Sequence, residues 1–321
     1  MDFSPSDDQV LLRETVHKLL ERECPPAVVR AHVDDPGAYE PLWHHLGEFT
    51  ALGLGPATDA CFALEETGHA AAPGPFFATV GLFVPLTGED AVGTVAVAGA
   101  DGAWQPNDDP VKTFVLEADR VDRIAVVLSG PRVAVVDRPD PQRLHFVATV
   151  DFSRRVFELD TSGLTLDSRP LTSEAYDGWH DRAHAGIAAE MVGTARRIFE
   201  MTLQYAKERH QFGVPIGSFQ ALQHKLAEMS LALERATAAV HYAAMTIDAG
   251  HRDRTRACHV AKAAAGEAAR RILKDGIQIH GGIGYTWEHD LHLYLRRATA
   301  DEYLLGQTGW HHDRLADQLF A

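Results

Sequence analysis

The sequence predicts a mainly helical protein that carries a small β domain between two helical regions. Apolar residues recur at helical spacing before about residue 90 and again after about residue 170. Between these regions, short runs rich in Val alternate with Gly, Pro, Asn and Asp, which is typical of strands joined by turns. We therefore expect an N-terminal helical domain over 1–90, a central β-sheet or barrel domain over 91–170 and a C-terminal four-helix bundle over 171–321.

The N-terminal region begins with a strong helix signal. Ser4 is a candidate N-cap, Pro5 suits the first helical turn, and Pro25 and Pro26 would end the helix. Shorter helices are predicted by the apolar periodicity of PLWHHLGEFTALGL and DACFALEETGHAAA.

The central and C-terminal regions differ in period. Strands are predicted in VGTVAVAG, KTFVLEA, RIAVVLSG, RVAVVD and RVFELD. Long helices are then expected over 179–208, 217–249 and 254–277, followed by a shorter piece and a terminal helix. Short connections between long helices favour an antiparallel bundle.

Composition excludes several classes of function. The chain has 45 acidic and 30 basic side chains among 321 residues, and a net charge of -15 repels nucleic acid and anionic membranes. Cys24, Cys61 and Cys258 show neither a disulfide framework nor zinc-ligand spacing. The first residues lack a signal-peptide pattern, and the apolar stretch GPFFATVGLFVPL is too short to span a bilayer. We expect a soluble, cytoplasmic protein.

An arginine, an aromatic ring and a glycine stand together in RHQFG, at the end of a predicted helix. A guanidinium forms paired hydrogen bonds with phosphate, a ring offers a stacking face, and glycine permits close backbone approach. Arg209, Phe212 and Gly213 are therefore candidates for holding a nucleotide. The alternative is a plain helix end with a buried Phe212 and a glycine stop, and these five residues alone favour that alternative.

A second cluster, QIHGGIGYTWEHD, ends another predicted helix. Its glycines leave backbone N–H groups accessible, and Gln278 supplies both a donor and an acceptor. Because the two clusters lie at the ends of separate bundle helices, they would form one site or two halves of a site between subunits.

These motifs resemble those of the acyl-CoA dehydrogenase family. The matching segments are RHQFGVPIGSFQALQHKLAEM at 209–229 and DGIQIHGGIGYTWEHDLHLYLRRA at 275–298, with weaker support from EETGHAAAPGPFFAT at 65–79. The resemblance covers most of the chain. It implies a helical domain, a central β domain and a four-helix bundle, assembled as a tetramer built from dimers.

The resemblance also implies FAD as the cofactor. In the family, the corresponding residues reach across the dimer interface and hold the ADP portion of an FAD whose isoalloxazine ring lies in the neighbouring subunit. Carried over residue by residue, this role falls to Arg209, Phe212, Gln220, Gln278, Gly281 and Gly282.

The chain departs from the family at the catalytic base. The reaction removes the α-hydrogen of an acyl-CoA as a proton and passes the β-hydrogen to the flavin as hydride, so it needs a carboxylate against the α-carbon. Alignment places Leu305 and Ala183 at the two known base positions, and neither can accept a proton. Asp181 and Glu302 are the nearby acids, and we expect Glu302 to be a solvated acid on a helix face. We therefore expect no catalytic residue in this chain.

The flavin-ring motifs of the family, a TEPxAGSD-like loop and a WITN-like strand, are also missing. Eighteen histidines raise the question of a metal, particularly in WHH, EHDLH and WHHD. None of these runs has the HExxH arrangement with a third ligand, so we expect surface or interface roles and no metal site.

The leading hypothesis is a subunit of a heteromeric acyl-CoA dehydrogenase. It resembles the shorter non-catalytic subunit of α2β2 actinobacterial enzymes that act on steroid-CoA thioesters, in which a homologous partner supplies the flavin-ring site and the glutamate. A self-sufficient homomeric enzyme with an unrecognised base is one alternative. A non-catalytic scaffold that reuses the bundle is another.

Overall fold

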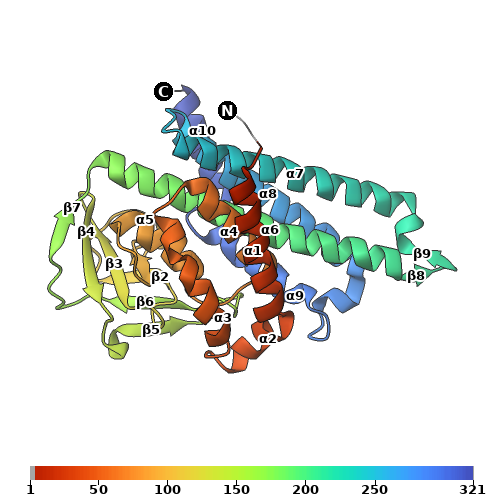
Figure 1. The fold of residues 1–321 in the computed structure, drawn as a ribbon, viewed down its shortest axis with the longest axis horizontal. Coiled ribbons are helices and arrows are strands. Elements are labelled where there is room, and N and C mark those ends of the chain that lie inside the picture. The colour runs from red at the N-terminus through yellow and green to blue at the C-terminus, as the bar shows by residue number, and fades with distance from the viewer. Residues whose placement is uncertain (1–3, 321) are drawn as a thin grey trace.

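A computed structural model describes residues 4–320 of the chain. Helices form most of it, and the strands between residues 93 and 170 gather at one side, on the left of Figure 1. The N-terminal helical elements are α1 (Asp7–Glu23), α2 (Pro26–Asp34), α3 (Glu40–Leu46), a 3₁₀ turn (Gly47–Gly53), α4 (Ala57–Ala70), a π-helical segment (Phe77–Phe83) and α5 (Val84–Thr87). None of the described helices combines the length and apolarity needed to cross a membrane.

The start of α1 corrects the sequence prediction. Ser6, and not Ser4, is the N-cap: its side chain accepts a hydrogen bond from the Gln9 backbone N–H, and the Gln9 side chain accepts one from Ser6 N–H. This reciprocal capping box satisfies two donors at once. The helix ends before Pro25, as expected, and Pro26 then begins α2 at a position where its missing N–H costs nothing.

The strands form open sheets and no closed barrel. They are β1 (Gly93–Ala96), β2 (Val111–Leu116), β3 (Arg123–Leu128), β4 (Arg132–Asp137), β5 (Leu144–Val147), β6 (Val156–Asp160) and β7 (Ser168–Pro170). One sheet has the order β1-β3-β4-β7, with β1 parallel to β3, and the other has the antiparallel order β2-β6-β5.

The C-terminal half contains the long helices. They are α6 (Ser173–Glu208), α7 (Gln220–Asp248), α8 (Arg254–His280), α9 (Leu291–Tyr303) and α10 (Thr308–Phe320), with a hairpin of β8 (His210–Gln211) and β9 (Val214–Pro215) after α6. Helix α6 begins earlier than the sequence predicts because Thr172 caps it, accepting a hydrogen bond from Ala175 N–H.

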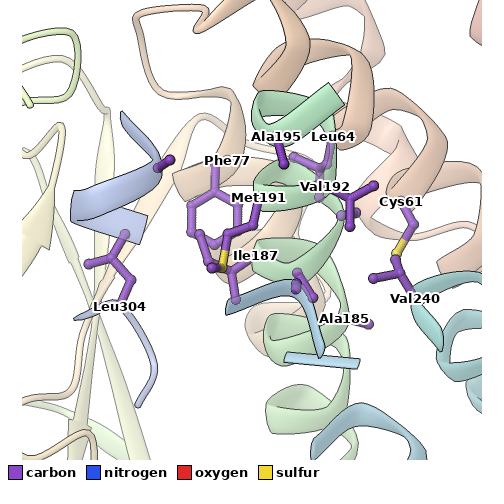
Figure 2. Close-up of a cluster of buried hydrophobic side chains, with 14 of the residues drawn as sticks. Cys61, Leu64, Phe77, Ala185, Ile187, Met191, Val192, Ala195, Val240 and Leu304 are labelled. Carbon is purple, nitrogen blue, oxygen red and sulfur yellow. The ribbon is translucent and has the colours of Figure 1, made fainter. Parts of the chain in front are cut away.

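Helix α6 is the centre of the molecule. Every residue from 183 to 195 is buried. Figure 2 shows its apolar side chains meeting those of α4, the π-helical segment and α7; the labelled residues include Leu64, Phe77, Ile187, Met191, Val192 and Val240.

Two glycines let α4 and α6 cross with their backbones in contact. A Cβ on Gly68 would lie 2.0 Å from the carbonyl oxygen of Glu190, and one on Gly193 would lie 1.8 Å from that of Glu65. Both distances are far below van der Waals contact, so only glycine fits at either position.

A buried network of salt bridges connects the β region to the helical bundle. Arg297 of α9 binds Asp151 at 2.6 Å and Glu190 of α6 at 2.8 Å. Arg154 binds the same Glu190 at 2.6 Å and Asp301 at 2.7 Å. Because Asp151 and Arg154 lie between β5 and β6, the network ties that segment to two helices.

Candidate functional site

The RHQFG segment forms the turn at the far end of α6, on the right of Figure 1. Arg209 is the C-cap of the helix. Phe212 stands at the tip of the β8–β9 hairpin with a φ of 53°, and 94% of it is exposed. Gly213 follows with a φ of 83°, which glycine adopts without strain. The alternative in which Phe212 is simply buried at a helix end is therefore wrong.

The second cluster lies at the same end of the bundle. Helix α8 ends at His280, and Gly281 turns the chain with a φ of 64°. The His280 ring stacks on Tyr205, near the end of α6, with ring centroids 4.5 Å apart. This contact brings the ends of α6 and α8 together.

Three polar side chains at this end are available for a ligand. Arg209, Gln220 and Gln278 are exposed, and none of their side chains forms a hydrogen bond or ion pair within residues 4–320. The positions where Gly281 and Gly282 would carry a Cβ face open space. The Gly281 N–H already donates to the carbonyl oxygen of Ile277, so the groups open to a ligand here are the Arg209 guanidinium and the Gln220 and Gln278 side chains. A guanidinium forms paired hydrogen bonds with phosphate, and an amide side chain offers both a donor and an acceptor.

Leu305, which the sequence analysis expects at the position of the family's usual base, lies in a buried turn at the end of α9. Leu305 is 1% exposed and has a φ of 58°. Its carbonyl oxygen accepts a hydrogen bond from His311 Nε2 at 3.2 Å. Leu305 borders a cavity of about 270 Å³, whose lining residues are Gly102, Ala103, Trp104, Gln105, His180, His184, Tyr303, Leu305, Gly306, Gln307 and Trp310.

None of the described residues that line this cavity is an aspartate or a glutamate. Asp181 accepts hydrogen bonds from Arg254 and Thr255 at the start of α8, and burial raises the pKa of its carboxyl to about 6. Ala183, at the second base position, is fully buried in α6.

Glu302 differs from its predicted role. It is not a solvated acid on a helix face, because only 8% of the residue is exposed. Its Oε1 accepts hydrogen bonds from the backbone N–H of Thr308, at 3.1 Å, and from the Thr308 hydroxyl, at 2.7 Å. The carboxylate thereby satisfies donors at the start of α10, a role that needs the tertiary structure to be seen.

Four histidines gather beside the cavity, from α6, α8 and α10. The ring of His184 packs against three other histidine rings, with centroid separations of 4.8 to 5.3 Å; these rings belong to His180, His259 and His311. Burial lowers the pKa of His180 and His259 to about 4 and that of His311 to about 3, and it lowers the pKa of His184 well below 6.5. The sequence prediction of surface or interface roles is wrong for His311 of WHHD, which is fully buried.

Comparison with known proteins defines the class. Residues 181–320 match the acyl-CoA dehydrogenase C-terminal domain. The chain is 34% identical to the acyl-CoA dehydrogenase IpdE2 of Mycobacterium tuberculosis over 94% of each sequence. The chain therefore belongs to the acyl-CoA dehydrogenase family, oxidoreductases that act on CH–CH groups with FAD as their cofactor.

Two solved structures share the whole fold. One is the ChsE4-ChsE5 complex from Mycobacterium tuberculosis, with a TM-score of 0.86, 21% identity and 99% of each chain covered. The other is a variant of the Tcur3481-Tcur3483 steroid ACAD, with a TM-score of 0.85, 23% identity and 98% of each chain covered.

The chain fits the two halves of FAD unequally. The exposed end of α6 and α8 offers the guanidinium, amides and open glycines that suit the ADP half. Beside Leu305, the cavity of about 270 Å³ is smaller than the roughly 300–1,000 Å³ of typical ligand pockets.

Proposed function

We propose that this chain is a subunit of a heteromeric FAD-dependent acyl-CoA dehydrogenase. In this proposal Arg209, Phe212, Gln220, Gln278, Gly281 and Gly282 hold the ADP half of an FAD, and a homologous partner supplies the flavin-ring site and the catalytic base. The complex is a heterotetramer of two chains of each kind, with FAD at half of the sites that a homotetramer would have.

The observation that carries the proposal is the cavity beside Leu305. Abstraction of an α-proton needs a base within hydrogen-bond reach of the substrate carbon. The described lining of the cavity has no carboxylate, and it includes Leu305, the residue expected at the family's base position. Asp181 and Glu302, the acids closest in sequence to Ala183 and Leu305, are engaged with α8 and α10 respectively.

The free end of α6 and α8 supports a role in a shared site. The side chains of Arg209, Gln220 and Gln278 have no partner within residues 4–320. The exposed aromatic residues there are Phe212, Tyr285 and Trp287, which expose 94%, 70% and 58% of their surfaces. Aromatic and arginine side chains are enriched in interfaces between proteins. The heteromeric ChsE4-ChsE5 complex, which has the same fold, gives a precedent for pairing.

A second candidate is a self-sufficient enzyme that uses a histidine. His180 and His184 line the cavity, and a neutral imidazole can accept a proton. Burial lowers the pKa of His180 to about 4 and that of His184 well below 6.5, which makes both weak bases for a carbon acid. We therefore rank this candidate below the heteromeric enzyme.

The test compares the chain alone with the chain co-expressed with a full-length homologue that retains the base glutamate. We expect the chain alone to hold little FAD and to show no dehydrogenation, and the complex to be yellow and active. FAD is quantified by absorbance after denaturation, and turnover is measured with a steroid-derived acyl-CoA and with a straight-chain acyl-CoA. We propose the steroid-derived substrate because one protein with this fold is a steroid ACAD.

One result would contradict the proposal. A purified single chain with one FAD per protomer and turnover in the absence of any partner would establish the self-sufficient enzyme. An absence of FAD in every complex would instead favour a non-catalytic scaffold.

A further inference from the structure

A groove between α1, α4 and α6 brings together a histidine, a glutamate and a second histidine. His17 comes from α1, and Glu66 and His69 come from successive turns on one face of α4. One ligand atom from each of the three lies within 4.8 Å of the others, and His17 Nδ1 is 2.7 Å from Glu66 Oε2. The sequence analysis missed this set because His17 and Glu66 are 49 residues apart in the sequence.

Neighbouring charges orient all three side chains. Glu200 of α6 holds Nε2 of His69 at 2.8 Å, and Glu21 lies 3.4 Å from Nε2 of His17. His17 faces the cluster with Nδ1, and the contact of His69 Nε2 with Glu200 leaves Nδ1 as the other possible ligand atom of that ring. Metal-binding histidines in proteins commonly donate their outer nitrogen to a carboxylate in this way.

The glutamate is held in the same manner. Arg13 Nε donates to Glu66 Oε1 at 3.1 Å, which leaves Oε2 directed toward His17. Glu66 is 3% exposed, whereas the side chains of His17 and His69 are 39% and 15% exposed. One ligand is thus buried and fixed, and two remain within reach of solvent.

Solvent reaches the cluster from both sides. A cavity of about 400 Å³ and one of about 240 Å³ are each lined by His17, Glu66 and His69. Neither cavity shares a lining residue with the one beside Leu305. A bound ion would therefore keep open coordination positions for water, away from the acyl-CoA chemistry.

We propose that His17, Glu66 and His69 bind one divalent transition-metal ion, with Zn²⁺ as the fitting chemistry. Two imidazole nitrogens and one carboxylate oxygen match a three-ligand zinc site completed by water. Imidazole selects Zn²⁺ over Mg²⁺ and Ca²⁺, which prefer oxygen ligands. The ion joins α1 to α4.

Calorimetric titration of chelator-treated protein with Zn²⁺ tests the proposal. We expect one site per chain, and binding should weaken at least tenfold in His17→Gln and in His69→Gln because each loses a ligand. Glu200→Gln, which keeps all three ligands but loses the orientation of His69, should weaken binding by roughly tenfold. The matched control is His44→Gln, an exposed histidine of α3, which should bind as the wild type does.

Two further measurements separate this site from other histidines. Co²⁺ in the site should give the strong visible absorption of low-coordinate cobalt, and this absorption should be lost in the double variant His17→Gln/His69→Gln. Zn²⁺ should raise the Tm of the wild type and not that of the double variant, and Mg²⁺ should raise neither. Equal Zn²⁺ stoichiometry and affinity in wild type and double variant, or no binding by the folded wild type, would overturn the proposal.

Discussion

Leu305 is unusual in its backbone as well as in its side chain. A φ of 58° places a non-glycine residue in the left-handed region, at a cost of about 1–2 kcal/mol. The turn is nevertheless held, because Leu305 is packed in the core and its carbonyl oxygen accepts a hydrogen bond from His311. His311 Nε2 donates this bond, so its Nδ1 accepts the 2.8 Å hydrogen bond from Nδ1–H of His259.

Restoring the acid at this turn should not create a second active site. In the heteromeric complex, Leu305→Glu should add no dehydrogenation, because a base without a flavin ring beside the substrate has no hydride acceptor. Asp181→Asn should keep most of the activity, whereas replacement of the partner's glutamate should remove several orders of magnitude. The measurement is the rate at saturating acyl-CoA with FAD occupancy determined in each variant. Near-complete loss in Asp181→Asn at full occupancy would mean that this chain supplies the base.

Arg209 should contribute to FAD retention in the complex. Arg209→Ala removes a charge-assisted hydrogen bond worth about 1.5–3 kcal/mol, so FAD affinity should fall by roughly tenfold or more. Equilibrium titration of the apo complex measures the change. Arg252→Ala is the matched control, because Arg252 is an exposed arginine in the α7–α8 connection. Unchanged affinity in Arg209→Ala would reject the clamp.

At the scale of elements, periodicity predicted the helices well and their contacts poorly. The long helices of the C-terminal half lie close to their predicted ranges, because the helical spacing of apolar residues can be recognised within each segment of sequence. The capping role of Ser6 was missed because Ser4 and Pro5 carry the same local signal. Glu302 as a cap for α10, and the pairing of His17 with Glu66, depend on tertiary packing and leave no local pattern.

The sequence left open whether the motifs at the ends of α6 and α8 form one site or two halves of a site between subunits, and the structure places both motifs at one end of the bundle. Their role in binding FAD stays a prediction. Periodicity could not have shown that the histidines of α6, α8 and α10 converge, because their spacing along the chain has no common period.

These converging histidines should make the protein acid-sensitive. Folding lowers the pKa of His180, His184, His259 and His311 below 6.5, so the unfolded chain binds more protons at acidic pH. Their contribution to stability is complete above about pH 6.5 and is lost as the pH falls toward about 4. Each histidine adds up to about 1.4 kcal/mol per pH unit to the slope in that window.

Urea denaturation across this pH range measures the effect. His184→Phe keeps a ring but removes one titrating group, so its free energy of unfolding should fall less steeply with acid than that of the wild type. His312→Gln, in the exposed part of α10, should leave the slope unchanged. Parallel slopes for His184→Phe and wild type would show that the buried histidines do not control acid stability.

At the scale of the whole molecule, the buried charges should make the β region and the bundle unfold together. Arg297→Met would leave Asp151 and Glu190 each without one cationic partner in the core, which typically costs about 3–5 kcal/mol. Urea denaturation followed by both circular dichroism and tryptophan fluorescence measures the loss. Lys274→Ala, an exposed position on α8, is the control. A loss below about 1 kcal/mol would show that the network contributes little.

The glycine crossing of α4 and α6 limits how this chain can diverge. Elsewhere in the core, a change in side-chain size can be accommodated by a change of rotamer. A side chain at Gly68 or Gly193 would instead collide with the backbone of the other helix, so the two helices keep one position relative to each other along their axes. Helix α4 carries Glu66 and His69, and α6 carries both Glu200 and, toward its other end, Ala183. The crossing thus sets the relative positions of the groove residues and of the region around Ala183. Substitutions in the groove or near Ala183 that spare both glycines would therefore keep the alignment of α4 with α6.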